Sequence, residues 1–440
     1  MTLALEVLGW AIFLFGVGFS IGLHEIGHLL PAKAFGVKVT QYMVGFGPTV
    51  WSRQKGETEY GVKAVPLGGY IRMIGMYPPA PGTDETKLRA SSTGRFSALI
   101  DDARKQSMDE VGPEDRDRVF YKLPIRKRIV VMLGGPTMNL LLAIVLMTIV
   151  VSIIGLPQTT TKVGAVAPCV PTASDAGGTK VNGACPAGPS AATVAGIQVG
   201  DQIVSFNGTP ITEWTQAQSA IRQSPAGEVP VVVIRNGVEQ TLTVDLKPVQ
   251  LPVYGTDGKP TGATESRNFV GLVPGFERQT DSVATVPGIM WDQATHAVSA
   301  IVTLPVRMYD LVRQTVTDEP RDPNGIVGVV GVGRLTGDAV ALETTPALDK
   351  TAFVLSLLAG LNLFLFLFNL IPLLPLDGGH VAGAVWEALK RGWARLRHLP
   401  APPPVDIAKA LPLTYVVSGL LLVLGAITIV ADLVKPITLQ

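Results

Sequence analysis

The sequence predicts an α-helical polytopic membrane protein with about four transmembrane helices, a small β-sheet next to the membrane and a separate α+β domain. Hydrophobic residues make up 47% of the 440 residues, and the mean hydropathy of +0.35 is high for a soluble protein. The excess lies in four apolar runs, each close to the roughly 20 residues that a helix needs to cross a bilayer. Between the runs, alternating and glycine-punctuated segments are typical of strands and turns.

The four apolar runs define the predicted spans and their orientation. They cover approximately residues 3–30, 129–154, 352–376 and 411–434. Basic residues gather in the loops after the first and third runs, which predicts that both loops are cytoplasmic: Lys33, Lys38, Arg126, Lys127 and Arg128, and then Lys390, Arg391, Arg395 and Arg397. The segment from about 157 to 350 and both termini are then expected outside. The first run lacks a basic n-region and a cleavage site, so we expect a retained span rather than a signal peptide.

Charge and cysteine content narrow the possible functions. Lys plus Arg total 36 and Asp plus Glu 35, so the net charge of +1 gives no sign of a nucleic-acid partner. The two cysteines, Cys169 and Cys185, are too few for a thiolate zinc site. They bracket a Gly/Pro/Ala-rich insert on the side predicted to be oxidising. A disulfide is therefore a candidate, with two free thiols as the alternative.

The end of the first apolar run carries the motif His24-Glu25-Ile26-Gly27-His28. Residues i and i+4 lie on one face of a helix, so His24 and His28 can bind one metal ion. Glu25 lies beside them, where it can take a proton from a water that the metal activates. The alternative is a chance match in a packed helix, but two of the five histidines fall within this pentapeptide.

A catalytic zinc site usually takes three protein ligands, so a third one is expected at the same membrane depth. Asp377 follows the third apolar run, where a carboxylate is costly unless it is paired or metal-bound. Pro372 and Pro375 break the helix, and Gly378-Gly379 allow tight backbone geometry that can turn Asp377 sideways. His380 competes for the ligand role but lies further toward water, so Asp377 is preferred.

Two asparagines on the third span are further candidates. Asn362 and Asn369 are seven residues apart and therefore share a helix face. A buried amide there could hold a substrate carbonyl or an oxyanion, or it could join two helices by hydrogen bonds. His296 and His398 lie in polar surroundings and are expected to be surface residues.

Residues 37–76 alternate like strands, and Gly68, Gly69 and Tyr70 precede a short strand. One interpretation is a small cytoplasmic sheet. The functional interpretation is a sheet that approaches the active site and offers an edge strand to an extended peptide. The insertion at residues 78–124 is predicted to lie at the surface, with a short helix near residues 94–105.

The outside segment is predicted to hold an α+β domain and an amphipathic stretch. Strands at residues 229–235 and 238–246 are joined by the hairpin turn Asn236-Gly237. Residues 286–317 are too polar to span, so they would lie on the outer membrane face or on the folded domain. The glycine-rich residues 325–333 lack the Lys-Ser or Lys-Thr of a phosphate loop, and no chemistry is assigned to them.

These motifs resemble the site-2 protease family of intramembrane zinc metalloproteases, in particular the bacterial regulator of sigma-E protease type with a single PDZ domain, as in actinobacteria. The matching motifs lie on three of the four spans, in the family's order: His24-Glu25-Ile26-Gly27-His28, then Gly134-Gly135-Pro136 with Asn139, then Asn369, Pro372, Pro375-Leu376-Asp377-Gly378-Gly379. Gly200-Asp201 and Asn207-Gly208 look like the core of a PDZ domain. Residues 45–48 and 66–70 look like the family's membrane-associated β-loop. The inserts at 78–124 and 168–190 depart from the family pattern.

The resemblance implies a multi-pass protein of the cytoplasmic (inner) membrane, with its active site toward the cytoplasm. The implied parts are transmembrane helix 1 (residues 1–30), a β-loop on the cytoplasmic side (31–77), a cytoplasmic insertion (78–128), transmembrane helix 2 (129–154), an extracytoplasmic PDZ domain (157–277), an extracytoplasmic amphipathic region (278–350), transmembrane helix 3 (351–380), a cytoplasmic loop (381–410) and transmembrane helix 4 (411–434).

The resemblance also implies an activity. The substrate would be a single-span membrane protein of type II orientation, such as an anti-sigma factor, already cut outside by a site-1 protease. The PDZ domain would sense the size or the end of the shortened substrate, and membrane lipid would surround the spans. The implied site consists of one Zn²⁺ held by His24, His28 and Asp377, the catalytic residues Glu25 and Asn369, and the substrate-binding residues Gly68, Gly69, Tyr70 and Asn362.

Two other functions remain open from the residues alone. A membrane-anchored zincin that cuts soluble peptides would place its third ligand, usually Glu, in a soluble helix, whereas the candidate here follows a span. A PDZ-bearing membrane scaffold with an idle site would not need the proposed catalytic groups, all of which are present.

Overall fold

The structure, a computed structural model, describes residues 2–78, 111–171, 184–254, 260–317, 319, 321–322, 325–342, 345–400 and 402–437. The chain forms two compact units. The helical unit comprises Met1–Ile154, Ser282–Arg321 and Gly325–Gln440, and the sheet unit comprises Gly155–Asp281 and Asp322–Asn324. The helix predicted near residues 94–105 lies outside the described residues.

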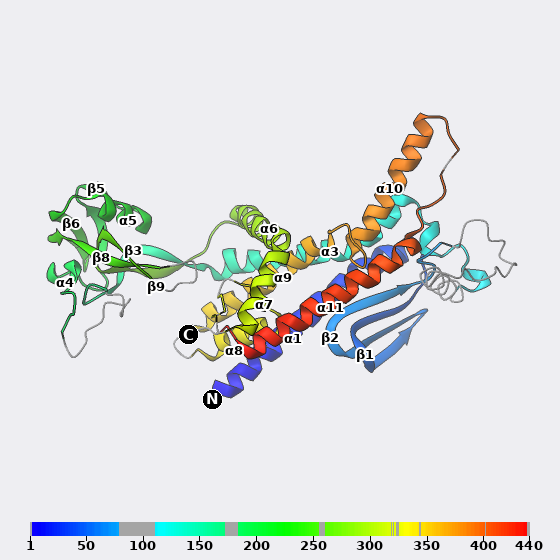
Figure 1. The fold of residues 1–440 in the computed structure, drawn as a ribbon, viewed down its shortest axis with the longest axis horizontal. Coiled ribbons are helices and arrows are strands. Elements are labelled where there is room, and N and C mark those ends of the chain that lie inside the picture. The colour runs from blue at the N-terminus through cyan, green and yellow to red at the C-terminus, as the bar shows by residue number, and fades with distance from the viewer. Residues whose placement is uncertain are drawn as a thin grey trace. The chain divides into compact units, whose positions relative to one another are not determined.

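Four of the described helices are long and apolar enough to cross a membrane, which confirms the prediction of four spans. They are α1 (Thr2–Ala34), α3 (Ile125–Thr148), α9 (Ala347–Asn369) and α11 (Leu411–Val434) (Figure 1). A π-helical segment, Ile149–Ile154, extends α3. The third span ends at Asn369 and not at residue 376 as predicted, because Pro372 and Pro375 cannot donate the hydrogen bonds that would continue the helix.

Glycines let α1 and α3 approach each other closely. Gly27 of α1 lies against the carbonyl group of Gly134 on α3, and Gly134 lies against the carbonyl group of Gly27. A Cβ at either position would collide with backbone atoms of the other helix. This crossing places the HExxH turn of α1 directly on α3.

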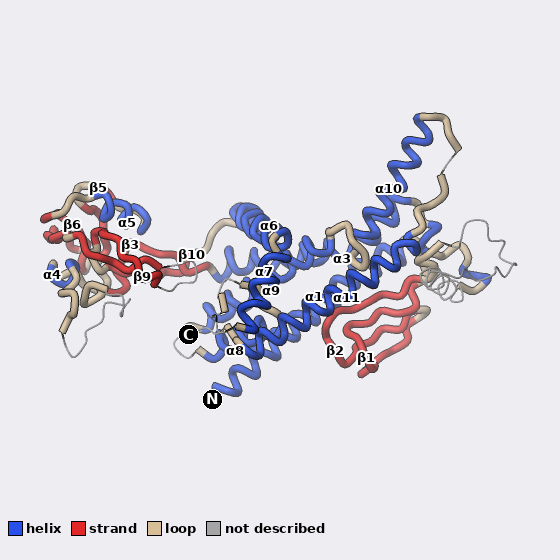
Figure 2. Tube along the Cα trace, viewed as in Figure 1, coloured by secondary structure: helices blue, strands red, loops and turns tan. Residues whose placement is uncertain are grey.

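The predicted sheet after the first span consists of two long strands, β1 (Val39–Lys55) and β2 (Thr58–Met73), which pair antiparallel beside α1 (Figure 2). Both strands shift register along their length, so each contributes two arms. Across the sheet the arms follow the order 69–73, 39–44, 58–63 and 49–55. Residues 69–73, called the outer arm below, therefore form one edge of the sheet.

Two shorter helices, α6 (Val286–Val302) and α7 (Leu304–Val316), cover the stretch predicted to be amphipathic. The sequence left two placements open, the membrane face or the folded domain. In the structure, Met308 and Leu311 of α7 pack against Ala431 of α11, within the helical unit and not on the sheet unit. Part of the apolar side of α7 is thus buried against a span, whereas Val298, Val302 and Val306 stay 46–74% exposed.

Two further helices, α8 (Val329–Ala341) and α10 (Asp377–Leu396), were not predicted from the sequence. Helix α8 contains much of the glycine-rich stretch, and its Gly333 lies against the Trp10 ring of α1. Glycine there permits close helix packing, which local propensity does not reveal. Helix α10 occupies most of the predicted loop at 381–410, because its apolar residues recur at helical spacing.

The sheet unit is built on an antiparallel sheet in the order β10-β3-β4-β6-β7, with β5 paired to β4. Its elements are β3 (Leu156–Val166), α4 (Ala191–Val194), β4 (Gln202–Phe206), β5 (Thr209–Pro210), α5 (Trp214–Gln223), β6 (Gly227–Arg235), β7 (Val238–Leu246) and β10 (Leu272–Gln279), with a separate hairpin of β8 (Pro248–Tyr254) and β9 (Pro260–Asn268). Ile203, Phe206 and Val231 lie in its core. The hairpin turn at Asn236-Gly237 is confirmed, with φ of 54° and 80°.

Candidate metal centre

His24 and His28 converge with Asp377, the first residue of α10. His24 Nε2 and His28 Nε2 lie 3.3 and 3.4 Å from Asp377 Oδ2, and 3.2 Å from each other. Among the described residues, these three side chains form a group whose donor atoms are close enough to hold one metal ion. The motif histidines are therefore brought together with Asp377 and not with His380.

The spacing of the three donor atoms fits a zinc ion. Zinc bonds of about 2.0–2.1 Å at tetrahedral angles place neighbouring ligand atoms about 3.3–3.4 Å apart. The measured separations, 3.2 to 3.4 Å, describe such a triangle. Asp377 Oδ2 is also buried and accepts no hydrogen bond of good geometry, which suits an atom that ligates a cation.

Groups on α3 set the orientation of both histidine rings. His28 Nδ1 donates to the Val131 carbonyl oxygen at 2.8 Å, which leaves the Nε2 lone pair free for a metal. His24 Nδ1 lies 3.2 Å from the side-chain amide of Asn139. Because that amide can turn by 180°, its oxygen can accept from His24 Nδ1–H, and Nε2 is again free. The Asn139 oxygen is buried and has no other partner.

Gly135 forms the floor of the site. A Cβ there would collide with His28 Nε2 and lie 2.7 Å from His24 Nε2, where the ligand atoms converge. Gly134, one residue earlier, makes the close crossing with α1. The Gly134-Gly135 pair thus has two tasks: one glycine brings the helices together, and the other leaves room for an ion.

The loop between α9 and α10 aims Asp377 at the histidines. Asp377 lies in the first turn of α10, where free backbone N–H groups favour a carboxylate. Gly378 packs against the backbone of Leu370 and Ile371, and a Cβ on Gly379 would lie 2.6 Å from the Leu374 nitrogen. Both glycines are therefore needed for this tight turn, as the sequence analysis expected.

Glu25 lies between the three ligands and the outer arm. Its side chain is 7% exposed. A Cβ on Gly69 of the outer arm would lie 2.9 Å from Glu25 Cγ, so the arm passes directly over this carboxylate. Tyr42 Oη donates to the Gly22 carbonyl oxygen at 2.8 Å and fixes the neighbouring arm to the same part of α1.

The other predicted substrate-binding residues lie in different surroundings. Gly68 lies next to the outer arm and Tyr70 lies on it, and both contact the Phe46 ring, whereas Gly69 between them faces Glu25. Asn369 is the partly buried last residue of α9. Asn362 is fully buried and donates to Ser20 Oγ at 2.9 Å, so it joins α9 to α1. That contact corresponds to the alternative role of the amide, a link between two helices.

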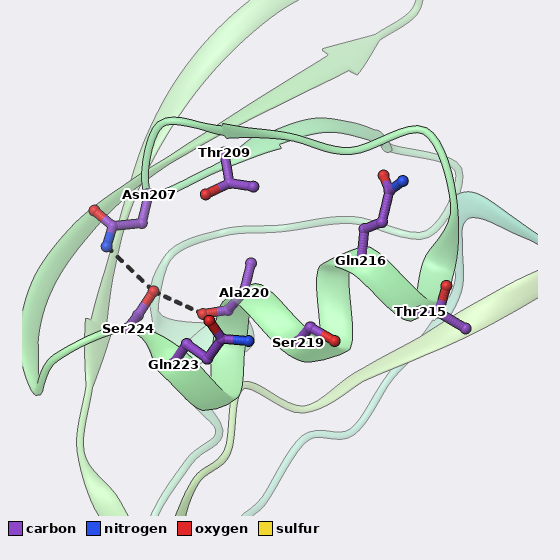
Figure 3. Close-up of a pocket in the computed structure, with 8 residues that line it drawn as sticks. All are labelled: Asn207, Thr209, Thr215, Gln216, Ser219, Ala220, Gln223 and Ser224. Atoms are coloured by element: carbon purple, nitrogen blue, oxygen red, sulfur yellow. Dashed lines mark hydrogen bonds between the residues drawn. The ribbon is translucent and has the colours of Figure 1, made fainter.

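The sheet unit contains a separate pocket of about 370 Å³ between α5 and the turn from β4 to β5 (Figure 3). Its lining is mostly polar and uncharged: Asn207, Thr209, Thr215, Gln216, Ser219, Ala220, Gln223 and Ser224. Asn207 Nδ2 donates to Ser224 Oγ at 3.2 Å. Cys169 and Cys185 of this unit are joined by a disulfide bond.

Asp201, from the Gly200-Asp201 pair that the sequence analysis singles out, forms a buried ion pair with Arg235. It is 1% exposed and accepts two hydrogen bonds of 2.7 Å from the Arg235 guanidinium. The Gln198 backbone N–H donates to it as well, at 2.9 Å. The hydrogen bonds from Arg235 hold the pKa of the Asp201 carboxyl below its usual value.

The helical unit has four candidate spans. Near the end of the first span, His24, His28 and the adjacent Glu25 meet Asp377 of α10. This combination defines a membrane metallohydrolase. The family model of peptidase family M50 matches residues 12–398. The chain is 35% identical to the zinc metalloprotease Rip1 of Mycobacterium tuberculosis H37Rv, over 98% of this chain and 99% of that protein. It is 32% identical to Rip1 of Mycolicibacterium smegmatis (98% of each chain) and 27% identical to the zinc metalloprotease RasP of Oceanobacillus iheyensis (86% and 90%). The chain therefore belongs to peptidase family M50, the site-2 protease family, and is a zinc-dependent protease.

Proposed function

We propose that this protein is an intramembrane endopeptidase that cleaves single-span membrane proteins. The observation that carries the proposal is the position of the His24, His28 and Asp377 cluster, at the end of a candidate span and beside the edge of a sheet. A hydrolytic site at that position suits a substrate that is itself a span and must unwind before it is cut.

His24, His28 and Asp377 would hold the zinc ion. When bound, the ion supplies a Lewis acid that polarises the scissile carbonyl and lowers the pKa of a water. Glu25 takes a proton from that water at its carboxylate and delivers it to the leaving amine nitrogen. Asn369, at the end of α9, would hold the substrate carbonyl or the oxyanion.

The outer arm would bind the unwound substrate. Backbone N–H and C=O groups at a sheet edge pair with an extended peptide and hold it in one register. Gly68 and Gly69 carry no side chain that would block the approach, and Gly69 packs on Glu25. A peptide paired with this arm would therefore run past the catalytic carboxylate.

The proposed orientation follows the basic residues at the span ends, with the active site toward the cytoplasm of a multi-pass protein in the cell membrane. The sheet unit would then be an extracytoplasmic PDZ domain. The substrate of the protease would be a membrane protein of type II orientation, such as an anti-sigma factor, shortened first by a site-1 protease. This PDZ domain would sense the size or the new end of the shortened substrate.

Substitution of the proposed base tests this function. Glu25→Gln should keep zinc and fold but abolish cleavage of a co-expressed single-span substrate, because an amide cannot take the proton. Glu6→Gln, on the same helix and away from the site, is the matched control and should cleave normally. Cleavage by Glu25→Gln would refute the mechanism. Wild-type cleavage of a soluble peptide in place of the membrane substrate would favour the anchored zincin.

A further inference from the structure

Helix α10 leaves a continuous apolar stripe uncovered. One side of the helix packs on α3, and Glu387 on that side is fully buried and paired with Arg128 of α3. Each residue turns the helix by about 100°. At that spacing, the exposed apolar residues of α10 fall within a stripe about 100° wide on the opposite side. Its members are 43–74% exposed: Val385, Trp386, Leu389, Trp393 and Leu396. A stripe with two tryptophans has the composition of a helix that meets a lipid interface.

Positive charge borders this stripe on both sides. By helical position, Lys390 and Arg397 flank one border and Arg395 flanks the other. The two acidic residues of α10 are not on the exposed surface, since Asp377 belongs to the metal cluster and Glu387 is fully buried. The exposed surface of α10 is therefore cationic and complements an anionic surface.

An apolar groove of about 560 Å³ continues the stripe at the C-terminal end of α10. It is lined by Trp386, Leu389, Lys390, Trp393, Ala394, Leu399, Pro400 and Pro402. Lys390 is the single charged residue of this lining. A long basic side chain at the rim of an apolar groove can place its stem among acyl chains and its ammonium group among headgroups.

Helix α10 follows a candidate span closely in the chain. Seven residues, 370–376, separate it from the last residue of the candidate span α9. Figure 1 shows α10 projecting sideways from α3 at one end of the helical unit. A helix that leaves a span sideways meets the headgroup layer with the side that it does not pack on its neighbour.

We propose that α10 lies in the membrane interface, with its apolar stripe among acyl chains and its basic borders on anionic lipid headgroups. Each Lys or Arg near such a surface contributes about a five-fold preference for anionic lipid. Because Asp377 is the first residue of α10, the leaflet would hold in place the helix that supplies the third metal ligand. The inference needs the candidate spans but does not depend on what the protease cleaves.

A fluorescent probe on the stripe tests the proposal in the full chain. Leu389→Cys, labelled with NBD while the native disulfide stays intact, is reconstituted into nanodiscs of phosphatidylcholine with or without phosphatidylglycerol. Brominated phosphatidylcholine should quench this probe, and phosphatidylglycerol should increase the quenching. Val238→Cys, equally exposed but in the sheet unit, is the control and should not be quenched.

A charge variant separates the headgroup contribution from simple burial. Lys390→Gln/Arg395→Gln/Arg397→Gln should lose the increase that phosphatidylglycerol gives, with zinc content unchanged as the check on folding. Arg222→Gln/Lys247→Gln/Lys162→Gln in the sheet unit should keep it. No bromine quenching at position 389 would overturn the proposal, as would shielding that depends on protein concentration, which indicates a second copy. Equal quenching in both lipids would overturn the assignment to anionic headgroups.

Discussion

Gly135 carries no functional group, yet it decides whether an ion fits between His24 and His28. A methyl group there would occupy the space where the two Nε2 atoms converge. We expect Gly135→Ala to lose most of its zinc, measured by elemental analysis, while circular dichroism stays unchanged. Gly360→Ala in α9, where a Cβ meets no atom within 4 Å, should keep its zinc. Full zinc occupancy in Gly135→Ala would contradict the assigned role.

Asn139 is predicted to position His24 and not to bind the metal itself. Loss of such a partner typically lowers metal affinity about 10–100-fold. Asn139→Leu should show that loss in a chelator competition. Asn139→Asp should restore affinity, because a carboxylate oxygen also accepts from His24 Nδ1–H. Equal affinities in the leucine variant and the wild type would show that His24 needs no such support.

The sequence predicted the residues whose chemistry is visible in their type and spacing. His24, Glu25, His28 and Asp377 stand out because such groups are rare in apolar runs. The separate roles of Gly134, which contacts α1, and Gly135, which leaves room for an ion, could not be predicted, because they depend on where α1 crosses α3. The polar Asn139 in an apolar run indicates a buried hydrogen bond, but its role as the partner of His24 was not predicted beyond its place in the family motif.

At the scale of elements, α10 is anchored to α3 by a buried ion pair. Arg128 Nη2 lies 2.8 Å from Glu387 Oε1, with these side chains 8% and 0% exposed. Arg391 and the Val405 backbone N–H also donate to Glu387, at 2.7 and 3.2 Å. Since α10 begins with Asp377, this contact fixes the middle of the helix that supplies the third ligand.

Removal of this anchor should loosen α10. Glu387→Ala leaves Arg128 buried and unpaired, which costs about 3 kcal/mol of unfolding free energy. We therefore expect zinc release at a lower temperature than in the wild type, followed with a zinc-sensitive dye. Asp117→Ala, which breaks an exposed pair with Lys122, should leave the release temperature unchanged. A Glu387→Ala protein with wild-type zinc release would disprove the anchoring.

Elements were predictable where hydropathy alone determines them. The four spans follow from the length of the apolar runs. Helix α8 was not predicted, because its glycines favour a loop until Trp10 of α1 packs on Gly333. Helix α10 was not predicted within the loop between the third and fourth spans, because its basic residues were used for orientation and not for helical spacing.

At the scale of the molecule, the two units depend on different polar groups. The helical unit joins its parts with buried contacts such as Arg321 to Asp432, which lie 2.7 Å apart. The sheet unit has the Asp201–Arg235 pair next to its core strands β4 and β6. Protonation of Asp201 in acid should therefore lower the stability of the sheet unit, and this effect does not require protonation of the metal ligands.

The pH dependence of this pair has a definite sign. The pKa of Asp201 is lowered in the folded state, so its stabilising contribution is fully present above the unfolded pKa of about 3.9 and is lost as pH falls through the folded pKa. We expect Asp201→Asn to lower the stability of the sheet unit at pH 7 by about 2 kcal/mol. The difference from the wild type should shrink below about pH 4, because protonation removes the same charge. Hydrogen–deuterium exchange of β4 and β6 in the full chain, corrected for intrinsic rates, measures both. A difference that stayed constant down to pH 2 would show that the charge on Asp201 does not stabilise this unit.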